Sequence, residues 1–286
     1  MTAAPPTPAP AAEPGLLLRL AGPLQSWGEH SHFNERDTAR FPTRSGVIGL
    51  LAAALGRRRG EPLDDLTRLS LTVRTDRPGV LLRDLHTVGG GLPPKATVTT
   101  AEGKKRTGDT GTLLTHRTYL ADAAFTVALT DTTAEDDDLL DRCAQALRTP
   151  QWPLFLGRRS CPPEGPVLLG QTHDTLHHLL HLPLAAQPPR TGTKGIEFLS
   201  DRPLNRLPHP ASPATAGTDD GTHPSGEVND EPLSFHPRHR AYRARPLYRR
   251  TLHLPDIPYA GLGTPHLHQL GAYLTAHLTR PEGSPR

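Results

Sequence analysis

The stretch from residue 40 to residue 58 reads RFPTRSGVIGLLAAALGRR. Apolar residues recur at helical spacing from Val47 to Leu55, and Gly56 supplies a stop signal directly after them. Pro42 stiffens the approach to this segment. A helix that is apolar on nearly every side buries most of its surface. We therefore expect a short helix that packs against a sheet, with its N-terminus fixed on a rigid support.

The N-terminus of this helix is the first candidate binding site. Thr43 or Ser45 can cap the helix, and Arg40 and Arg44 flank its free backbone N–H groups. Free N–H groups beside arginines attract phosphate. An ordinary buried helix with a good cap explains the same residues, and this stretch alone favours that simpler interpretation over a nucleic-acid contact.

The basic residues of the chain are almost all arginine. The 286 residues carry a net charge of +3, and lysine occurs only at positions 95, 104, 105 and 194. Arginine suits bidentate contact with phosphate and stacking on bases. A coding bias towards G and C accounts for arginine in place of lysine, but not for where the arginines cluster. The length allows one elaborated domain or two small ones.

The sequence predicts neither secretion nor membrane insertion. Residues 1–14 are rich in proline and alanine and lack the basic segment of a secretion signal, so we expect a disordered tail there. The apolar run at residues 16–24 is short and contains Arg19. Cys143 and Cys161 have no metal-like or redox spacing. These features favour a reducing, cytoplasmic setting.

Residues 173–181, HDTLHHLLH, raise the question of a metal site. His173, His177 and His181 stand at helical i,i+4 spacing, which suits zinc, but the only nearby acid is Asp174. A zinc hydrolase of the HExxH kind needs a carboxylate base beside its two histidines. No P-loop, GxSxG or cysteine-centred nucleophile motif occurs. We expect no metal, no cofactor and no catalytic residue, and keep a zinc-dependent hydrolase as a weaker alternative.

The segments around the first helix predict an α+β fold. A second helix is expected after Thr132 or Thr133, with apolar residues from Leu139 to Leu147 facing the core. The expected strands are residues 16–20, 69–74, 80–85, 118–130, 152–155 and 167–169. We interpret this order as the βαββαβ of a ferredoxin-like domain, the architecture of the RNA-recognition fold (RRM). The aromatic pair that stacks bases in a standard RRM is absent, which disfavours RNA binding on the sheet face.

Three further segments gather basic residues. Residues 86–117 hold no sustained period and contain the cluster KKR, and residues 156–163, LGRRSCPP, place a glycine beside two arginines and a serine. Residues 235–254 interleave arginine with tyrosine. All three suit contact with a polyanion. Solvated turns and charged faces are the commoner outcomes for such runs.

Five strings occur in order between Leu16 and about Leu169: LLLRLAGPLQSWG, RFPTRSGVIGLLAAALG, LRDLHTV, THRTYLADAAFTVAL and PLFLGRRSCPP. Together they resemble the fifth family of CRISPR-associated (Cas) RAMP proteins, in the form found in type I-E Cascade complexes. Several matched strings in one order are more specific than any single motif. The N-terminal tail, residues 208–231 and the part after Pro255 depart from the family.

The resemblance implies a ferredoxin-like (RRM-like, RAMP) βαββαβ domain with a thumb hairpin insertion and a small β-rich C-terminal region. The expected boundaries are 1–14 for the disordered tail, 15–170 for the RAMP domain with its thumb at about 86–117, 171–254 for the C-terminal region with a flexible insertion at 208–231, and 255–286 for a C-terminal extension. Deleting residues 211–229 of the insertion is expected to matter little.

The resemblance also implies a non-catalytic subunit that binds the 5′ handle of the guide RNA (crRNA) and caps the backbone of a CRISPR Cascade surveillance complex in antiviral defence. Its partners would be that handle, the backbone and large subunits, and target DNA through the complex, with no membrane involved. The residues expected at the RNA are Gln25, Trp27, Arg40, Thr43, Arg44, Ser45, His86, Arg117, Tyr119, Arg158, Arg159 and Ser160.

A metal-independent endoribonuclease that processes CRISPR repeat RNA is the alternative function. His86 and the distant His30 or His32 would then act as acid and base. The two functions share the RNA but differ in whether the chain cuts it. For the first, alanine at Arg44 or Arg158 is expected to weaken RNA binding and leave the fold intact, because both look like exposed charges in loops.

Overall fold

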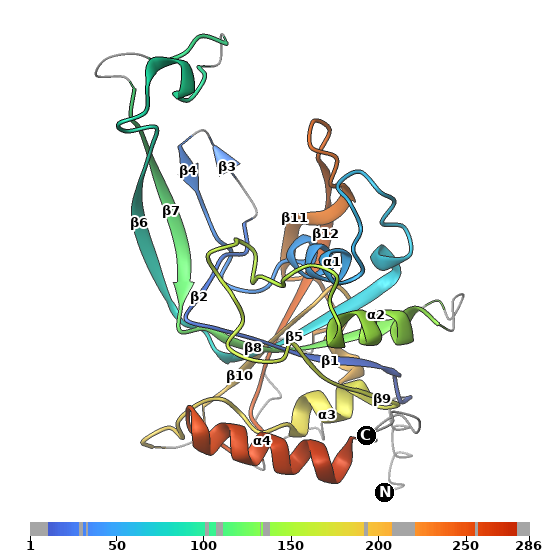
Figure 1. The fold of residues 1–286 in the computed structure, drawn as a ribbon. Coiled ribbons are helices and arrows are strands. Elements are labelled where there is room, and N and C mark those ends of the chain that lie inside the picture. Colours follow the sequence, from blue (N-terminus) through green and yellow to red (C-terminus); the bar gives the residue numbers. More distant parts are fainter. Residues whose placement is uncertain are drawn as a thin grey trace, which may run out of the picture.

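The computed structural model has a seven-stranded antiparallel sheet at its centre (Figure 1). The strands are β1 (Gly15–Ala21), β5 (Leu69–Arg77), β8 (Ala124–Asp131), β9 (Leu168–Thr172), β10 (Ile196–Ser200), β11 (Gly226–Ser234) and β12 (Ala241–Leu252), in the order β11-β12-β10-β5-β8-β1-β9. The helices are α1 (Arg44–Ala54), α2 (Leu139–Arg148), α3 (Thr175–His181) and α4 (Thr264–His277). The structure describes residues 11–28, 31–32, 34–100, 103–106, 111–131, 133, 138–191, 194–207, 221–254 and 257–278. A mixed fold with antiparallel sheets, as predicted, is confirmed.

Strand β1 is apolar on both faces because helices cover the sheet on both sides (Figure 1). Leu16, Leu18 and Leu20 join the core that includes α1 and α2, whereas Leu17 joins the core that includes α3 and α4. Full burial of one leucine side chain is worth about 1.5–3 kcal/mol. Strand β1 therefore connects the two cores of the molecule.

Helix α1 forms where the opening stretch predicts it. Thr43 is the N-cap, and its side-chain oxygen accepts a hydrogen bond from the Gly46 N–H at 3.3 Å. Val47, Ile48 and Leu51 are buried against the sheet. The helix therefore rests on a rigid support, as expected, and its opposite side is free to line a site.

A smaller sheet extends from the body as an arm (Figure 1). Strand β6 (Val80–Val88) pairs with β7 (Leu113–Ala121) over its whole length, and 3₁₀ turns occur at Pro94–Ala96 beyond it and at Leu66–Arg68 and Leu204–Arg206 elsewhere. The short strands β2 (Leu24–Gln25), β3 (Ser31–His32) and β4 (Glu35–Arg36) complete this sheet. The predicted thumb is therefore a long hairpin whose regular stem starts before His86.

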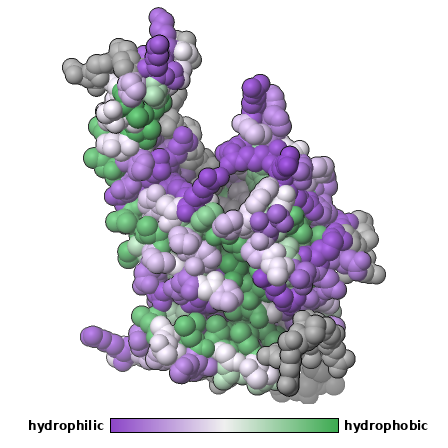
Figure 2. Space-filling view, in the orientation of Figure 1, coloured by the Kyte–Doolittle hydropathy of each residue, from purple (hydrophilic) through white to green (hydrophobic). Residues whose placement is uncertain are grey.

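The arm carries apolar side chains into solvent. Val80, Leu85 and Leu114 are exposed by 66%, 59% and 52%. Figure 2 shows hydrophobic surface along the arm, in contrast to the hydrophilic surface around the hollow beside it. A hairpin with no second layer cannot cover such residues itself. An exposed apolar strip of this kind is typical of a surface that meets another protein.

Two expected strands are wrong, and the second helix is present but begins later than expected. Residues 118–130 do not form one strand, because the chain turns at Asp122, with φ of 56°, and passes from the arm into the central sheet. Residues 152–155 form no strand and belong to the loop between α2 and β9. Helix α2 has Asp138 as its N-cap, so it begins later than a cap at Thr132 or Thr133 would place it.

The predicted flexible insertion is also partly wrong. Residues 208–220 lie outside the described residues, but residues 226–231 belong to β11. Val228 and Asp230 of this strand are buried. Deleting residues 211–229 would remove the first part of β11, so we now expect that deletion to disturb the edge of the central sheet.

Helix α4 belongs to the predicted C-terminal extension and covers the face of the sheet opposite α1 (Figure 1). Leu270 is buried in the second core, and the Tyr273 hydroxyl lies 2.9 Å from Nδ1 of His178 on α3. His266, in the first turn of α4, is 2% exposed. None of the helices in the described part of the chain has the length and apolar character needed to span a bilayer.

The docking of α4 is expected to weaken in acid. Burial lowers the pKa of His266 from its ordinary value of 6.5, and Arg19 lowers it further. The imidazole of His266 therefore binds a proton more readily in the unfolded chain than in the folded one. The stability that neutral His266 gives to the folded protein is complete above the ordinary pKa, and it is lost as the pH falls below about 6.5. His266→Leu should reduce the fall in melting temperature between about pH 8 and about pH 5.5. An unchanged fall would contradict this role for His266.

Candidate nucleic-acid interface

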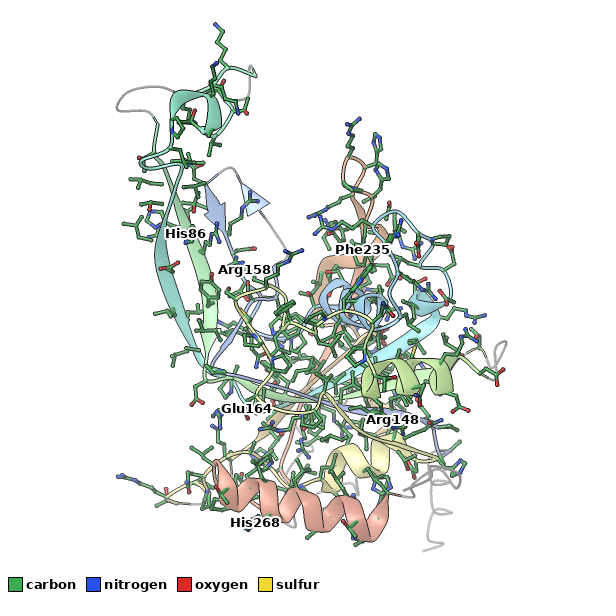
Figure 3. The ribbon with its side chains drawn as sticks, in the orientation of Figure 1. His86, Arg148, Arg158, Glu164, Phe235 and His268 are labelled. Carbon is green, nitrogen blue, oxygen red and sulfur yellow. The ribbon has the colours of Figure 1, made fainter. Side chains whose placement is uncertain are left out.

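Two adjoining cavities form one groove over α1. They measure about 780 and 570 Å³ and share Ser45, Gly46, Gly157, Phe235, Arg240 and Tyr242. The α1 helix provides the floor, the loop between α2 and β9 one wall, and the connection between β11 and β12 the other. In Figure 3, Arg158 lies between the arm and Phe235, which come from opposite sides of this groove. Helices, sheet and arm thus bring segments far apart in sequence to one place.

Two of the N–H groups at the N-terminus of α1 donate to side chains of the protein. The Arg44 N–H donates to Oδ2 of Asp230 at 2.6 Å, and the Gly46 N–H donates to the Thr43 side chain. Asp230 also receives two hydrogen bonds from Arg245, at 2.6 and 2.9 Å. A carboxylate of β11 thus takes the position expected for phosphate. The N–H groups of Arg44 and Gly46 are therefore engaged within the protein, and a phosphate contact at this terminus stays a prediction.

The side chain of Arg44 is buried, not exposed. Its guanidinium donates to the Leu69 carbonyl at 2.7 Å and forms an ion pair with Asp201, and its Nε lies 2.7 Å from the Glu231 carboxylate. Asp201 in turn accepts from the Ser70 hydroxyl at 2.6 Å. Arg44 therefore joins α1 to β5, β10 and β11. The expectation that alanine here leaves the fold intact is contradicted by this network.

Gln25 and Trp27 also belong to the interior. Trp27, one of the residues expected at the RNA, is 1% exposed, and its Nε1 donates to Oε1 of Gln25 at 2.9 Å. The Gln25 amide donates to the carbonyls of Leu20 and Ala123. These contacts join β1, β2 and the turn before β8. Trp27 lines the smaller cavity of the groove, although its side chain is almost entirely buried.

Arg158 is a second arginine whose side chain is used inside the protein. It donates to the carbonyls of Thr118, Arg36 and Asp37 at 3.0–3.1 Å, and it lies 4.7 Å from the ring centre of Tyr119, which is buried. Only glycine fits at position 157, because a Cβ there would lie 1.7 Å from the Ser26 carbonyl oxygen. The glycine allows close approach, as predicted, but to the protein's own backbone.

Arg158 and Arg159 form a natural pair for comparison. Arg158→Ala removes three hydrogen bonds from a charged donor, so we expect it to lower the free energy of unfolding by about 2 kcal/mol. Arg159 is exposed, and its replacement should change stability by less than about 0.5 kcal/mol. Thermal denaturation of both variants measures the difference. Equal stability of the two proteins would contradict the structural role of Arg158.

The other predicted residues lie in three places. Ser45 and Arg159 line the groove, while Arg40 and Ser160 are exposed and do not belong to its described lining. His86 and Arg117 are on the arm, where His86 Nδ1 lies 3.8 Å from the Asp84 carboxylate. The predicted partners of His86 in RNA cleavage, His30 and the side chain of His32, lie outside the described residues, so that pairing stays a prediction.

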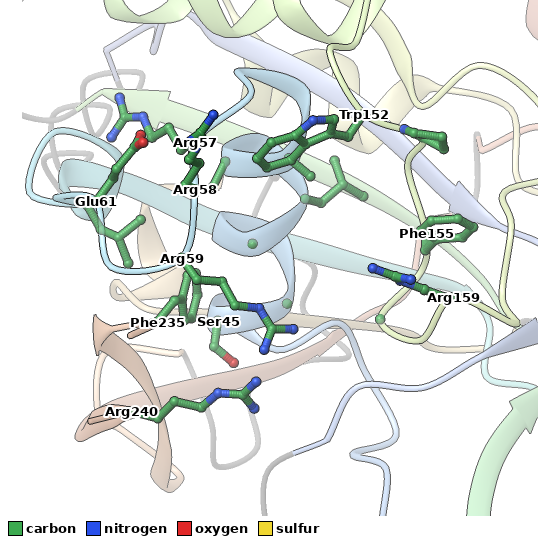
Figure 4. A pocket seen from close by; sticks show the side chains of 18 of the residues that line it. Ser45, Arg57, Arg58, Arg59, Glu61, Trp152, Phe155, Arg159, Phe235 and Arg240 are labelled. Carbon is green, nitrogen blue, oxygen red and sulfur yellow. The ribbon is translucent and has the colours of Figure 1, made fainter. Parts of the chain in front are cut away.

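Four arginines in the groove have no counter-ion within the described part of the chain. The side chains of Arg58, Arg59, Arg159 and Arg240 form no ion pair or hydrogen bond with any described residue, whereas the adjacent Arg57 pairs with Asp65. That hydrogen bond lowers the pKa of Asp65 and raises that of Arg57. In Figure 4 the guanidinium groups of Arg59 and Arg159 point towards each other across α1. Four unneutralised cations around one hollow attract an anion.

The sequence singles out only part of this site. Arg58 ends the opening stretch, and Arg240 and Tyr242 fall in the arginine and tyrosine run at residues 235–254, so their composition already suggests nucleic acid. No motif indicates that Arg59 belongs with them. Three aromatic residues also line the larger cavity: Trp152, Phe155 and Phe235. Rings and arginines in one groove suit single-stranded nucleic acid.

Comparison with known proteins gives consistent matches. The family model described as CRISPR-associated protein (Cas_Cas5) matches residues 15–248. The CRISPR system Cascade subunit CasD of Escherichia coli (strain K12) is 41% identical over 180 residues, which are 58% of this chain and 75% of that protein. A solved chain of a CRISPR RNA-guided surveillance complex is similar with a TM-score of 0.76 and 40% identity, over 91% of this chain and 99% of that one. A solved Cas protein is similar with a TM-score of 0.54 and 31% identity, over 86% and 98%.

Proposed function

Because this chain belongs to the Cas5 family of CRISPR-associated proteins, we propose that it binds guide RNA as a non-catalytic subunit of a Cascade-type surveillance complex. The E. coli relative is by name a Cascade subunit, and the similar solved chain comes from an RNA-guided complex. The observation that carries the proposal is the groove itself, where four arginines have no ion-pair or hydrogen-bond partner among the described residues. Phosphates of a bound RNA would neutralise them.

The fold supports the same assignment. The strands β9-β1-β8-β5 with α1 and α2 follow the βαββαβ order of a ferredoxin-like RAMP domain, with β10, β11 and β12 added at one edge. The arm of β6 and β7 would serve as the thumb. Its exposed apolar strip suits a neighbouring backbone subunit, and the 5′ handle of the crRNA would lie in the groove at its base. The large subunit and target DNA would be reached through the complex, in the cytoplasm.

The non-catalytic role rests on the chemistry of the groove. Its described lining includes no histidine or cysteine, and its acids are Glu61 and Asp37, which line different cavities. Metal-independent RNA cleavage needs an acid and a base within reach of one phosphate. The groove therefore suits binding of RNA rather than its hydrolysis.

Co-purification tests the function directly. A tagged full-length chain, produced together with the other subunits and a CRISPR array of its own host, should bring down several subunits and one short RNA. Its recovery should fall as salt rises, because phosphate contacts release counterions. Recovery of the tagged chain alone would contradict the proposal. Site-specific cutting of labelled repeat RNA by the purified chain without metal would favour the endoribonuclease instead.

A further inference from the structure

We propose that the larger cavity of the groove holds one unstacked nucleobase of the bound RNA, with Trp152 as its stacking partner. This inference rests on the proposed function and adds to it a site for a base. The cavity of about 780 Å³ is within the range of sites that enclose small ligands. The arginines at the rim are sufficient to bind a phosphate. The aromatic side chains are not needed for that contact, and they suit a nucleobase instead.

The aromatic side chains of the cavity are unusually open. Trp152 is 39% exposed, and Phe155 and Phe235 are only half-buried. They come from two separate segments, the loop after α2 and the connection after β11, yet they face the same hollow. Figure 4 shows Trp152 and Phe155 on one side of it and Phe235 on the other. Rings held apart around a space offer a base a plane to stack on.

The charges are placed to hold the backbone on either side of such a base. Arg59 and Arg240 lie near Phe235, and Arg159 lies beside Phe155 (Figure 4). A guanidinium binds phosphate with two parallel hydrogen bonds and also stacks on a base. A nucleotide whose base enters the cavity therefore finds cations for its phosphates at both walls. This arrangement fits a single strand with one base turned away from its neighbours.

Small residues of α1 form the floor of the cavity. Gly49 and Ala53 line it, and a Cβ at position 49 would meet only the Phe235 ring, at 3.8 Å. By contrast, a Cβ at Gly46 would lie 2.6 Å from the Trp27 ring, so packing requires that glycine. Glycine inside a helix costs about 1 kcal/mol relative to alanine. Packing within the protein does not require glycine at position 49. A nucleobase lying close to α1 would require it, because the base would occupy the space next to Gly49.

Tryptophan fluorescence provides a selective test. The chain has two tryptophans, and Trp27 is buried and hydrogen-bonded to Gln25, so a ligand in the cavity reports through Trp152. The probes are a short single-stranded RNA and a spacer oligonucleotide of equal length and charge without bases. Fluorescence anisotropy of an end label measures binding separately. The RNA should quench the emission of Trp152 and bind about tenfold more tightly than the spacer, which should bind without quenching.

A pair of glycine variants separates the base from the phosphates. Gly49→Leu places a side chain in the cavity and keeps every arginine, and it should abolish the quenching and the tenfold preference for RNA. Gly271→Leu on α4 is the matched control, because no atom of the described residues lies within 4 Å of its Cβ position. Circular dichroism shows whether each variant is folded. The comparison of RNA with the spacer oligonucleotide uses the unaltered protein, so it does not depend on the folding of any variant.

The outcomes distinguish this inference from the proposed function. No binding of RNA in the anisotropy assay would overturn both. Binding of RNA and spacer with equal affinity and no quenching would overturn the base site alone and leave the RNA-binding groove. Quenching that persists in folded Gly49→Leu would place the base elsewhere and overturn the site as well.

Discussion

Replacing Arg44 with alanine is expected to lower the free energy of unfolding by about 3–5 kcal/mol, because it leaves buried charges without their partner. Asp201 and Glu231, with side chains only 10% and 12% exposed, would both lose the guanidinium that pairs with them. The carbonyl of Leu69 would lose its donor as well. The larger part of this cost comes from the carboxylates left behind, chiefly Asp201, because Glu231 keeps Arg243 at 3.9 Å.

The lost contacts all lie between distant parts of the chain. Arg44 connects α1 to Asp201 after β10 and to Glu231 in β11, so its removal should loosen the edge of the central sheet as a unit. Lysine should restore little, since one ammonium cannot replace the several directions of a guanidinium. Hydrogen exchange should therefore increase in β11 and β12 before it increases in β1.

Thermal and urea denaturation of Arg44→Ala measure the effect, with Arg40→Ala as the matched control four residues earlier. Arg40 is exposed, and its replacement should change stability by less than about 0.5 kcal/mol. Similar melting temperatures for both variants would contradict the buried network. The comparison also separates stability from RNA binding, because Arg40 is one of the residues expected at the RNA.

These two arginines show how far the sequence could predict the site. Apolar spacing and a cap determine α1, and the structure has that helix with Thr43 as its cap. From their spacing, Arg40 and Arg44 are equally good candidates for a contact at the N-terminus of this helix. What separates them is the acids at positions 201, 230 and 231, which no local pattern connects to residue 44. Local propensity thus predicts the helix, and long-range pairing decides which arginine stays available.

The same distinction applies to β11. A segment rich in proline, serine, glycine and aspartate reads as a flexible insertion, and its few apolar residues give no strand signal. Its end is ordered by partners elsewhere: Asp230 by Arg245 and by the N–H of Arg44, and Val228 by the core next to α1. Alternation of apolar and polar residues, which predicts a strand, does not reveal a strand that is held by buried charged pairs. The groove wall that carries Phe235 could not be predicted for this reason.

Replacing Arg59 and Arg159 together with glutamine is expected to weaken RNA binding about 10- to 100-fold at physiological salt. Both side chains line the larger cavity without an internal counter-ion among the described residues, so the change removes charge from the RNA site and from no ion pair of the fold. The matched control is Arg148→Gln with Arg190→Gln. Those arginines are exposed outside the groove, and Figure 3 shows Arg148 at α2.

The salt dependence identifies the cause of the loss. For a single strand each phosphate contact contributes about 0.7 to the slope of log affinity against log salt, so the groove variant should lower that slope by about 1.4, twice this amount. The control has the same change in net charge, and its slope should stay within error of the unaltered chain. Equal losses in both proteins would mean that total charge attracts the RNA and that the groove has no special part in it. A loss confined to the groove variant, at unchanged melting temperature, would assign the phosphates to Arg59 and Arg159, because only position distinguishes the two pairs.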